Sequence, residues 1–142
     1  MDYLPQERAR GITIRSAAIS FNWSGHQINL IDTPGHVDFS GEVARSLRVL
    51  DGVVTIFDAV HGVQTQTEKV WREASQRNLP KIAFINKMDR LGASVQHTIK
   101  TIQERLKSES LLLQEPIGEF EMFKGVVDLL TLESTVFEGF KG

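Results

Sequence analysis

A strand-like run in the first quarter of the chain ends in residues whose types suit phosphate chemistry. The apolar, β-branched run Gln27–Ile31 predicts a buried strand, which breaks into Asp32, Thr33, Pro34, Gly35 and His36. In an open parallel sheet, ligands sit beyond the carboxyl ends of the strands. A carboxylate at Asp32 therefore suits a phosphate-bound Mg²⁺, and the N–H of Gly35 can approach a terminal phosphate closely. An ordinary turn after a strand is the alternative.

A second run, Lys81–Ile85, ends in Asn86, Lys87, Met88 and Asp89. A carboxylate such as Asp89 can accept two N–H bonds from the Watson–Crick edge of guanine, and adenine lacks that pair of donors. Sites built on such paired polar groups can discriminate by roughly 10⁴–10⁵. The stem of Lys87 would lie along a face of the base. The alternative is a polar helix cap that follows a strand.

A third candidate is Thr13, which comes shortly after Gly11 and begins a β-branched run. Its hydroxyl, on a loop that has just left a glycine, can reach a metal ion. The same pattern also fits the plain entry of a loop into a strand, and the residues alone leave both possibilities open.

The elements that would position these residues alternate between strands and helices. Period-two alternation over Ser16–Trp23 predicts a half-buried strand, and Ser24-Gly25 predicts a hairpin turn before the returning strand. The next predicted element is a helix with Val43, Leu47 and Leu50 on one face, followed by a buried strand over Val53–Asp58. A helix near Thr65–Gln76 and the strand Lys81–Ile85 come next. The last of these elements is a helix with Val95, Ile99, Ile102 and Leu106 on one face. Strand–helix–strand order predicts an α/β fold with a mostly parallel sheet and flanking helices.

Beyond Lys107–Ser110 the alternation of strands and helices stops. We expect an edge strand over 111–118 and two more strands over Phe123–Leu130 and Thr135–Phe140. Three short strands without helices between them predict the start of a small inserted α+β subdomain. The predicted organisation is therefore a partial nucleotide-binding domain over 1–108 and the start of this subdomain over 109–142.

Composition limits the classes of function. The 142 residues are enough for one domain and one core, and the net charge of −2 argues against a large basic footprint for nucleic acid. The chain has no cysteine, which excludes disulfides and thiolate chemistry. No apolar run approaches the length of a membrane span, and the N-terminus lacks the character of a signal or transit peptide. We therefore expect a soluble chain that does not act at a membrane.

The order and spacing of these motifs resemble the guanine-nucleotide-binding domain of GTPases. The stretches Gly11–Ile14, Asp32–His36 and Asn86–Asp89 together look like the ribosome-associated translational class. Within that class, Leu47–Gly52 and Asn86–Arg90 resemble elongation factor G, and Phe123–Leu129 looks like the inserted subdomain of that family. The stretches Ala18–Trp23, Thr55–Asp58 and Leu111–Gln114 look closer to mitochondrial elongation-factor-G-like ribosome-releasing factors.

The resemblance implies roles for the candidate residues. Thr13 would sense Mg²⁺ and the terminal phosphate of GTP, Asp32 would hold the metal through water, and Gly35 would report the terminal phosphate. His36 would orient the attacking water and would be engaged by ribosomal RNA. Asn86, Lys87, Met88 and Asp89 would bind GTP or GDP through the base. The implied partners are the ribosome and, for a releasing factor, the ribosome recycling factor, and the implied location is mitochondrial.

One departure from the family pattern is large. The phosphate loop Gly-x-x-x-x-Gly-Lys-Ser/Thr occurs nowhere in the chain, although in the family it lies upstream of these motifs. We therefore expect a GTPase fragment that is inactive alone, whose strands lack a neighbour and expose apolar edges. Three alternatives are kept: a translocation-type elongation factor G, a nucleotide-free interaction module that keeps the fold, and a generic P-loop ATPase. Asn86–Asp89 argues against the last of these.

Overall fold

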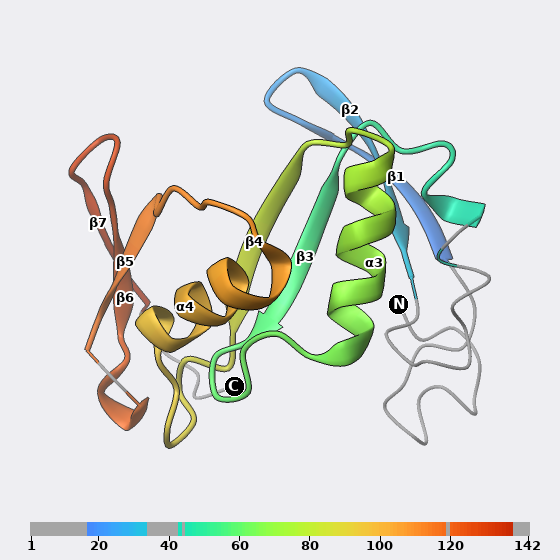
Figure 1. The fold of residues 1–142 in the computed structure, drawn as a ribbon. Helices are drawn as coiled ribbons and strands as arrows, with labels where there is room; N and C mark the ends of the chain where they lie inside the picture. The colour runs from blue at the N-terminus through green and yellow to red at the C-terminus, as the bar shows by residue number, and fades with distance from the viewer. Residues whose placement is uncertain (1–16, 34–42, 44, 119, 138–142) are drawn as a thin grey trace, which may run out of the picture. The chain divides into compact units, whose positions relative to one another are not determined.

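The structure is a computed structural model that describes residues 17–33, 43, 45–118 and 120–137 (Figure 1). These residues fall into two compact units. The first unit draws its described residues from Met1–Val53 and Lys69–Lys81, and the second from Val54–Glu68 and Ile82–Gly142. Among the described residues, no helix is both long enough and apolar enough to cross a membrane.

The first unit contains the predicted hairpin. Strand β1 (Ala17–Trp23) pairs antiparallel with strand β2 (His26–Asp32), and Trp23 lies opposite His26. Between them, Ser24 and Gly25 both have positive φ, at 46° and 77°, as a two-residue hairpin turn of the primed type requires. The Ser20 hydroxyl donates to Asn29 Oδ1 across the pair at 2.7 Å. The hairpin that the alternating pattern predicts is thereby confirmed. The burial predicted for its strands is wrong for the described residues, since Phe21 is 42% exposed and Leu30 is 45% exposed.

The core of the first unit forms around helix α3 (Thr65–Gln76), which crosses the division between the units. Its buried residues in this unit are Trp71 and Ala74. Ala74 packs in a cluster with Val43 and Leu47, against which Leu50, Val53, Val70 and Leu79 also lie. Val43, Leu47 and Leu50 meet at this one cluster, as predicted. The predicted helix is shorter than expected, because the chain from Leu47 onward forms a turn and a bend.

Strand β3 (Val53–Asp58) and strand β4 (Lys81–Asn86) form a two-stranded sheet. The amides of Val53 and Ala59 donate to the carbonyls of Pro80 and Asn86, each at 2.9 Å, in the same direction and at the same offset along the chain. Constant offset between strands joined by a crossover is the pattern of parallel pairing, as the strand–helix–strand order predicts.

The prediction that Val53–Asp58 is a buried strand is wrong for one of its faces. The side chains of Val54, Ile56, Ile82 and Phe84 are between 55% and 64% exposed. Phe57, on the opposite face of β3, is only 1% exposed. Successive side chains of a strand point to opposite faces, so Val54 and Ile56 share the face that the described residues leave exposed. The apolar run therefore reflects a two-sided strand of which the described residues cover one side.

Helix α4 (Val95–Leu106) packs into the core of the second unit. Ser94 caps the N-terminus of the helix, because its hydroxyl accepts from His97 N at 3.1 Å. Lys107 caps the C-terminus in the left-handed conformation. Its residues Val95 and Ile99 join a cluster that also contains Ala59, Ile85, Met88 and Ala93. The predicted apolar face of this helix is therefore confirmed, and His97 lies exposed, away from that face.

The end of the chain forms a three-stranded antiparallel sheet of β5 (Gln114–Ile117), β6 (Gly125–Asp128) and β7 (Ser134–Val136), with a short 3₁₀ helix η2 (Phe120–Met122) after β5. Three strands are therefore present, as predicted. The first begins at Gln114 and not at residue 111, since Leu112 packs into the cluster around Met88 while Leu111 is 81% exposed. The domain boundary at residue 108 stays a prediction.

Candidate functional site

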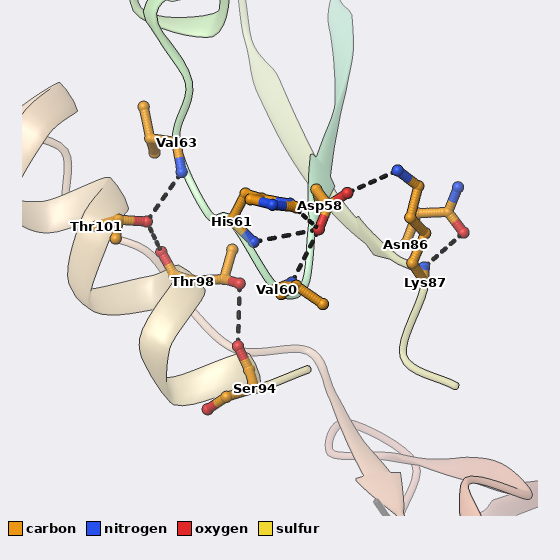
Figure 2. Close-up of polar contacts among 9 residues, drawn as sticks. All are labelled: Asp58, Val60, His61, Val63, Asn86, Lys87, Ser94, Thr98 and Thr101. Carbon is orange, nitrogen blue, oxygen red and sulfur yellow. Dashed lines mark hydrogen bonds and ion pairs between the residues drawn. The ribbon is translucent and has the colours of Figure 1, made fainter. Parts of the chain in front are cut away.

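The loop that follows β4 is supported by the last residue of that strand. Asn86 Oδ1 accepts from the amide of Lys87 at 2.8 Å (Figure 2). The carbonyl of Asn86 accepts from Ala59 N at 2.9 Å. Lys87 has a φ of +64°, a left-handed conformation that is uncommon for a residue other than glycine. The Asn86 carboxamide therefore supports a backbone turn that ends the strand abruptly and leads the following residues out of the sheet.

The side chain of Met88 is buried, whereas the side chain of Asp89 is exposed. Met88 is 9% exposed and packs in the cluster with Ala59, Ala93 and Val95, so it anchors the loop in the core. Asp89 is exposed, and none of the residues that the structure describes pairs its carboxylate. A loop with a buried anchor and an outward carboxylate can offer that carboxylate to a ligand without rearranging.

Asp58 is a residue of this site that the sequence motifs do not indicate. It ends β3, and its Oδ2 accepts from Lys87 Nζ at 2.6 Å, while its other oxygen accepts from the amides of Val60 at 2.9 Å and His61 at 3.1 Å (Figure 2). The hydrogen bond from Lys87, assisted by those two amides and against the effect of burial, holds the pKa of Asp58 well below its ordinary value. The signal that could have found it is its place at a strand end, which Asp32 and Asn86 share.

His61 lies in the same loop as Asp58 and is exposed. Its side chain is 65% accessible, and Nδ1 lies 3.1 Å from Asp58 Oδ1. This exposure is what is expected of a lone histidine in a surface loop.

The segment after Asp58 is attached to α4. The amide of Val63 donates to Thr101 Oγ1 at 3.1 Å, and the amide of Ser94 donates to the carbonyl of Ala59 at 2.9 Å. Arg105 of α4 donates to the carbonyl of Val63 and, through Nε, to Glu68 Oε1 at 2.6 Å. The loop after β3, the loop after β4 and the helix α4 are therefore joined by backbone and side-chain contacts within one unit.

The phosphate side of the predicted site lies in the other unit or outside the described residues. Asp32 is the last residue of β2 and Thr33 follows it, and both are half-buried. Thr13, Pro34, Gly35 and His36 fall outside the described residues. The structure thus brings Asn86, Lys87, Met88 and Asp89 together with Asp58, and it does not fix the position of Asp32 relative to them.

Comparison with known proteins identifies the domain type. The family model described as "Elongation factor Tu GTP binding domain" matches residues 1–138. A crystal structure of a protein from Thermus thermophilus matches 97% of this chain and 21% of that chain, with a TM-score of 0.87 and 27% sequence identity. These matches confirm the predicted α/β fold of the GTPase type.

Curated relatives belong to two kinds of translation factor. "Ribosome-releasing factor 2, mitochondrial" of Pongo abelii is 57% identical over 96% of this chain and 18% of its own length. "Elongation factor G 1" of Geobacter sulfurreducens is 56% identical over 96% of this chain and 20% of its own length. "Elongation factor G" of Dehalococcoides mccartyi strain BAV1 is 61% identical over 92% of this chain and 19% of its own length.

The chain therefore spans about a fifth of the length of these relatives. Both resemblances that the sequence motifs indicate, to elongation factor G and to mitochondrial ribosome-releasing factors, are confirmed by the names of the relatives. With nearly all of its residues matched by the family model, the chain belongs to the family of the elongation factor Tu GTP-binding domain.

Proposed function

We propose that this chain is the guanine-nucleotide-binding part of a ribosome-dependent translational GTPase that acts in mitochondrial ribosome disassembly. The observation that carries the proposal is the loop after β4, in which Asn86 supports the turn, Met88 anchors it and Asp89 presents an outward carboxylate. That carboxylate would accept two N–H bonds from guanine and reject adenine.

The phosphate end of the nucleotide would be served by Asp32, Thr33, Pro34, Gly35 and His36, with Thr13. Mg²⁺ is typically bound by one or two carboxylates and the phosphates of the substrate. Asp32, a half-buried carboxylate at the end of β2, fits that donor set. When bound, the ion would neutralise charge that develops on the phosphate oxygens. Gly35 would donate its N–H to the terminal phosphate, and His36 would orient the attacking water.

The relatives support the ribosome as partner, since their names include ribosome-releasing factor 2 and elongation factor G. Ribosomal RNA would engage His36, so that hydrolysis waits for the ribosome. The mitochondrial location and the ribosome recycling factor as partner follow the releasing-factor relatives. A translocation-type elongation factor G is the second candidate, because relatives of that name reach similar identity over a similar share of the chain.

Exchanging the base-reading carboxylate tests the base assignment. The tests use the full-length protein, with a phosphate loop of a translational GTPase joined upstream if its own sequence lacks one. Asp89→Asn should weaken GDP binding and shift preference toward XDP, because the C2 carbonyl of xanthine accepts from an amide. A variant that binds GDP as tightly as the parent and ignores XDP would remove Asp89 from the site.

The catalytic assignment is tested at His36. His36→Ala should leave GTP affinity nearly intact and slow ribosome-stimulated hydrolysis by about 10² or more, the scale of a lost positioning group. A rate within a few-fold of the parent contradicts the role. Full activity of the parent in a translocation assay, without ribosome splitting, would favour the second candidate.

A further inference from the structure

Asp58 and Lys87 form an ion pair that links the ends of two neighbouring strands. Lys87 Nζ lies 2.6 Å from Asp58 Oδ2 (Figure 2). The side chain of Asp58 is 10% exposed and that of Lys87 is 41% exposed. The carboxylate is thus the enclosed partner, and part of the lysine side chain remains open to solvent.

We propose that Asp58 is a positioning residue for nucleotide binding, which holds the side chain of Lys87 in one place to receive the base. The inference rests on the proposed function, because Lys87 belongs to the loop assigned to guanine. Asp58 would not touch the nucleotide. It would act through Lys87, by fixing the ammonium group at one end of the stem.

Asp58 is itself fixed before any ligand arrives. Its Oδ1 accepts from the amides of Val60 and His61, so the carboxylate is locked in a turn that begins with its own residue. The same turn is tied to the loop after β4 by the bond from Ala59 N to the carbonyl of Asn86. The acceptor therefore occupies a defined place relative to Lys87.

Lys87 is held at both of its ends. Its amide donates to Asn86 Oδ1, and its ammonium donates to Asp58 Oδ2, with the methylene stem between these two bonds. A free lysine side chain has several rotatable bonds and loses conformational entropy when a ligand orders it. A stem that is ordered before binding avoids that loss, which is the general advantage of preorganisation.

A plain ion pair that only stabilises the fold is the competing interpretation. The chain offers a matched control, since Asp128 also accepts from two amides that follow it, those of Leu130 at 2.8 Å and Thr131 at 3.0 Å. No described lysine, arginine or histidine pairs with Asp128. A substitution there disturbs the same kind of turn without changing Lys87.

The test compares GDP affinity in Asp58→Asn, Asp128→Asn and the parent, in the full-length protein described above. Asp58→Asn keeps an oxygen for the turn and removes the charge that holds Lys87, so GDP affinity should fall roughly tenfold. Asp128→Asn should leave GDP affinity unchanged. Asp58→Glu, which keeps the charge and lengthens the side chain by one methylene, should recover part of the loss.

The double variant with Lys87→Ala separates positioning from a structural role. If Asp58 acts through Lys87, Asp58→Asn should add little to the loss caused by Lys87→Ala alone. Additive losses, or an unchanged affinity in Asp58→Asn, would overturn the inference. If Asp58→Asn does not fold, GDP affinity is measured for Asp58→Glu with and without Lys87→Ala. Additive losses in that pair would likewise overturn the inference.

Failure of the proposed function gives a different pattern. In that case the parent would not prefer GDP over ADP, and Asp89→Asn would not shift the preference toward XDP. A parent that passes both of those tests while Asp58 and Lys87 act additively would contradict the positioning role of Asp58 alone.

Discussion

Two loops in the second unit have the same turn geometry but lie in different surroundings. At the end of β3, Asp58 accepts from the amides two and three residues later, and its carbonyl accepts from Gly62 N at 2.8 Å. At the end of β6, Asp128 makes the corresponding bonds, and its carbonyl accepts from Leu132 N at 2.9 Å. Both loops finish on a residue with positive φ, 63° at Gly62 and 60° at Leu132.

The difference lies in what surrounds each loop. A Cβ added at Gly62 would collide with Thr101 Oγ1 of α4, so only glycine fits. Leu132 occupies the corresponding position with a side chain that is 78% exposed. The first loop also carries the ion pair of Asp58 with Lys87. One kind of turn thus serves once as a simple strand connection and once as a fixed support for a candidate binding loop.

Gly62→Ala should have the largest effect on local stability. An alanine at this position is strained by the positive φ, and its Cβ would displace Thr101. Thr101 would then lose the hydrogen bond that it accepts from Val63 N. Together these should lower the free energy of opening of the segment 58–63 by about 2–3 kcal/mol. Native-state hydrogen exchange at the Val63 amide measures this. Unchanged protection would mean that α4 does not constrain the loop.

Asp58→Asn should have the next largest effect. The variant keeps the turn but leaves the Lys87 ammonium without its acceptor, which should cost about 1–2 kcal/mol of local stability at pH 7. Asp128→Asn, measured in the same hydrogen-exchange experiment, should cost less, because only bonds to exposed amides change. Equal losses at the two sites would show that the ion pair contributes nothing beyond the turn.

The difference in stability between the parent and Asp58→Asn should depend on pH. The pKa of Asp58 is lowered in the folded protein from an ordinary value of 3.8. Between the lowered and the ordinary pKa the unfolded chain binds more protons, so folding stability rises with pH there. The contribution of Asp58 should be complete above about pH 5 and should fade as pH decreases below 4. A gap between the parent and Asp58→Asn that stays constant from pH 6 to pH 3 would contradict this.

The smallest effect should be a gain. Leu132 carries its side chain at positive φ and buries little of it, so Leu132→Gly should remove strain at small cost and stabilise the segment 128–132 by about 0.5–1 kcal/mol. Hydrogen exchange of the Leu132 amide gives the value. A loss of protection would mean that the exposed leucine contributes more than the strain costs.

Much of the fold follows from local patterns in the sequence. Ser24-Gly25 predicts the hairpin turn, and the spacing of Val95, Ile99 and Ile102 predicts the buried face of α4, because these signals depend on neighbouring residues only. The predicted start of β5 is wrong because Leu111 to Leu113 look like a strand, while in the structure Leu112 packs against the cluster around Met88.

The candidate site is predictable in part for the same reason. Asn86–Asp89 stands out as a polar stretch at a strand end, and the structure joins it to the turn through Asn86 and to the core through Met88. Its role in binding guanine stays a prediction. The pairing of Asp58 with Lys87 is not predictable from either stretch alone, since it depends on the parallel register of β3 and β4. Exposure of Val54 and Phe84 depends likewise on which elements cover the sheet.

The most direct test of the central claim is competition between GDP and ADP for the full-length protein, with a phosphate loop joined upstream if needed. A labelled GDP is displaced by unlabelled GDP or ADP at equilibrium. If the carboxylate of Asp89 reads the guanine edge, displacement by ADP should need about 10³-fold or more the concentration of GDP. Equal displacement by the two nucleotides would contradict the account, because a loop that does not distinguish guanine from adenine is not the base site of a GTP-binding domain.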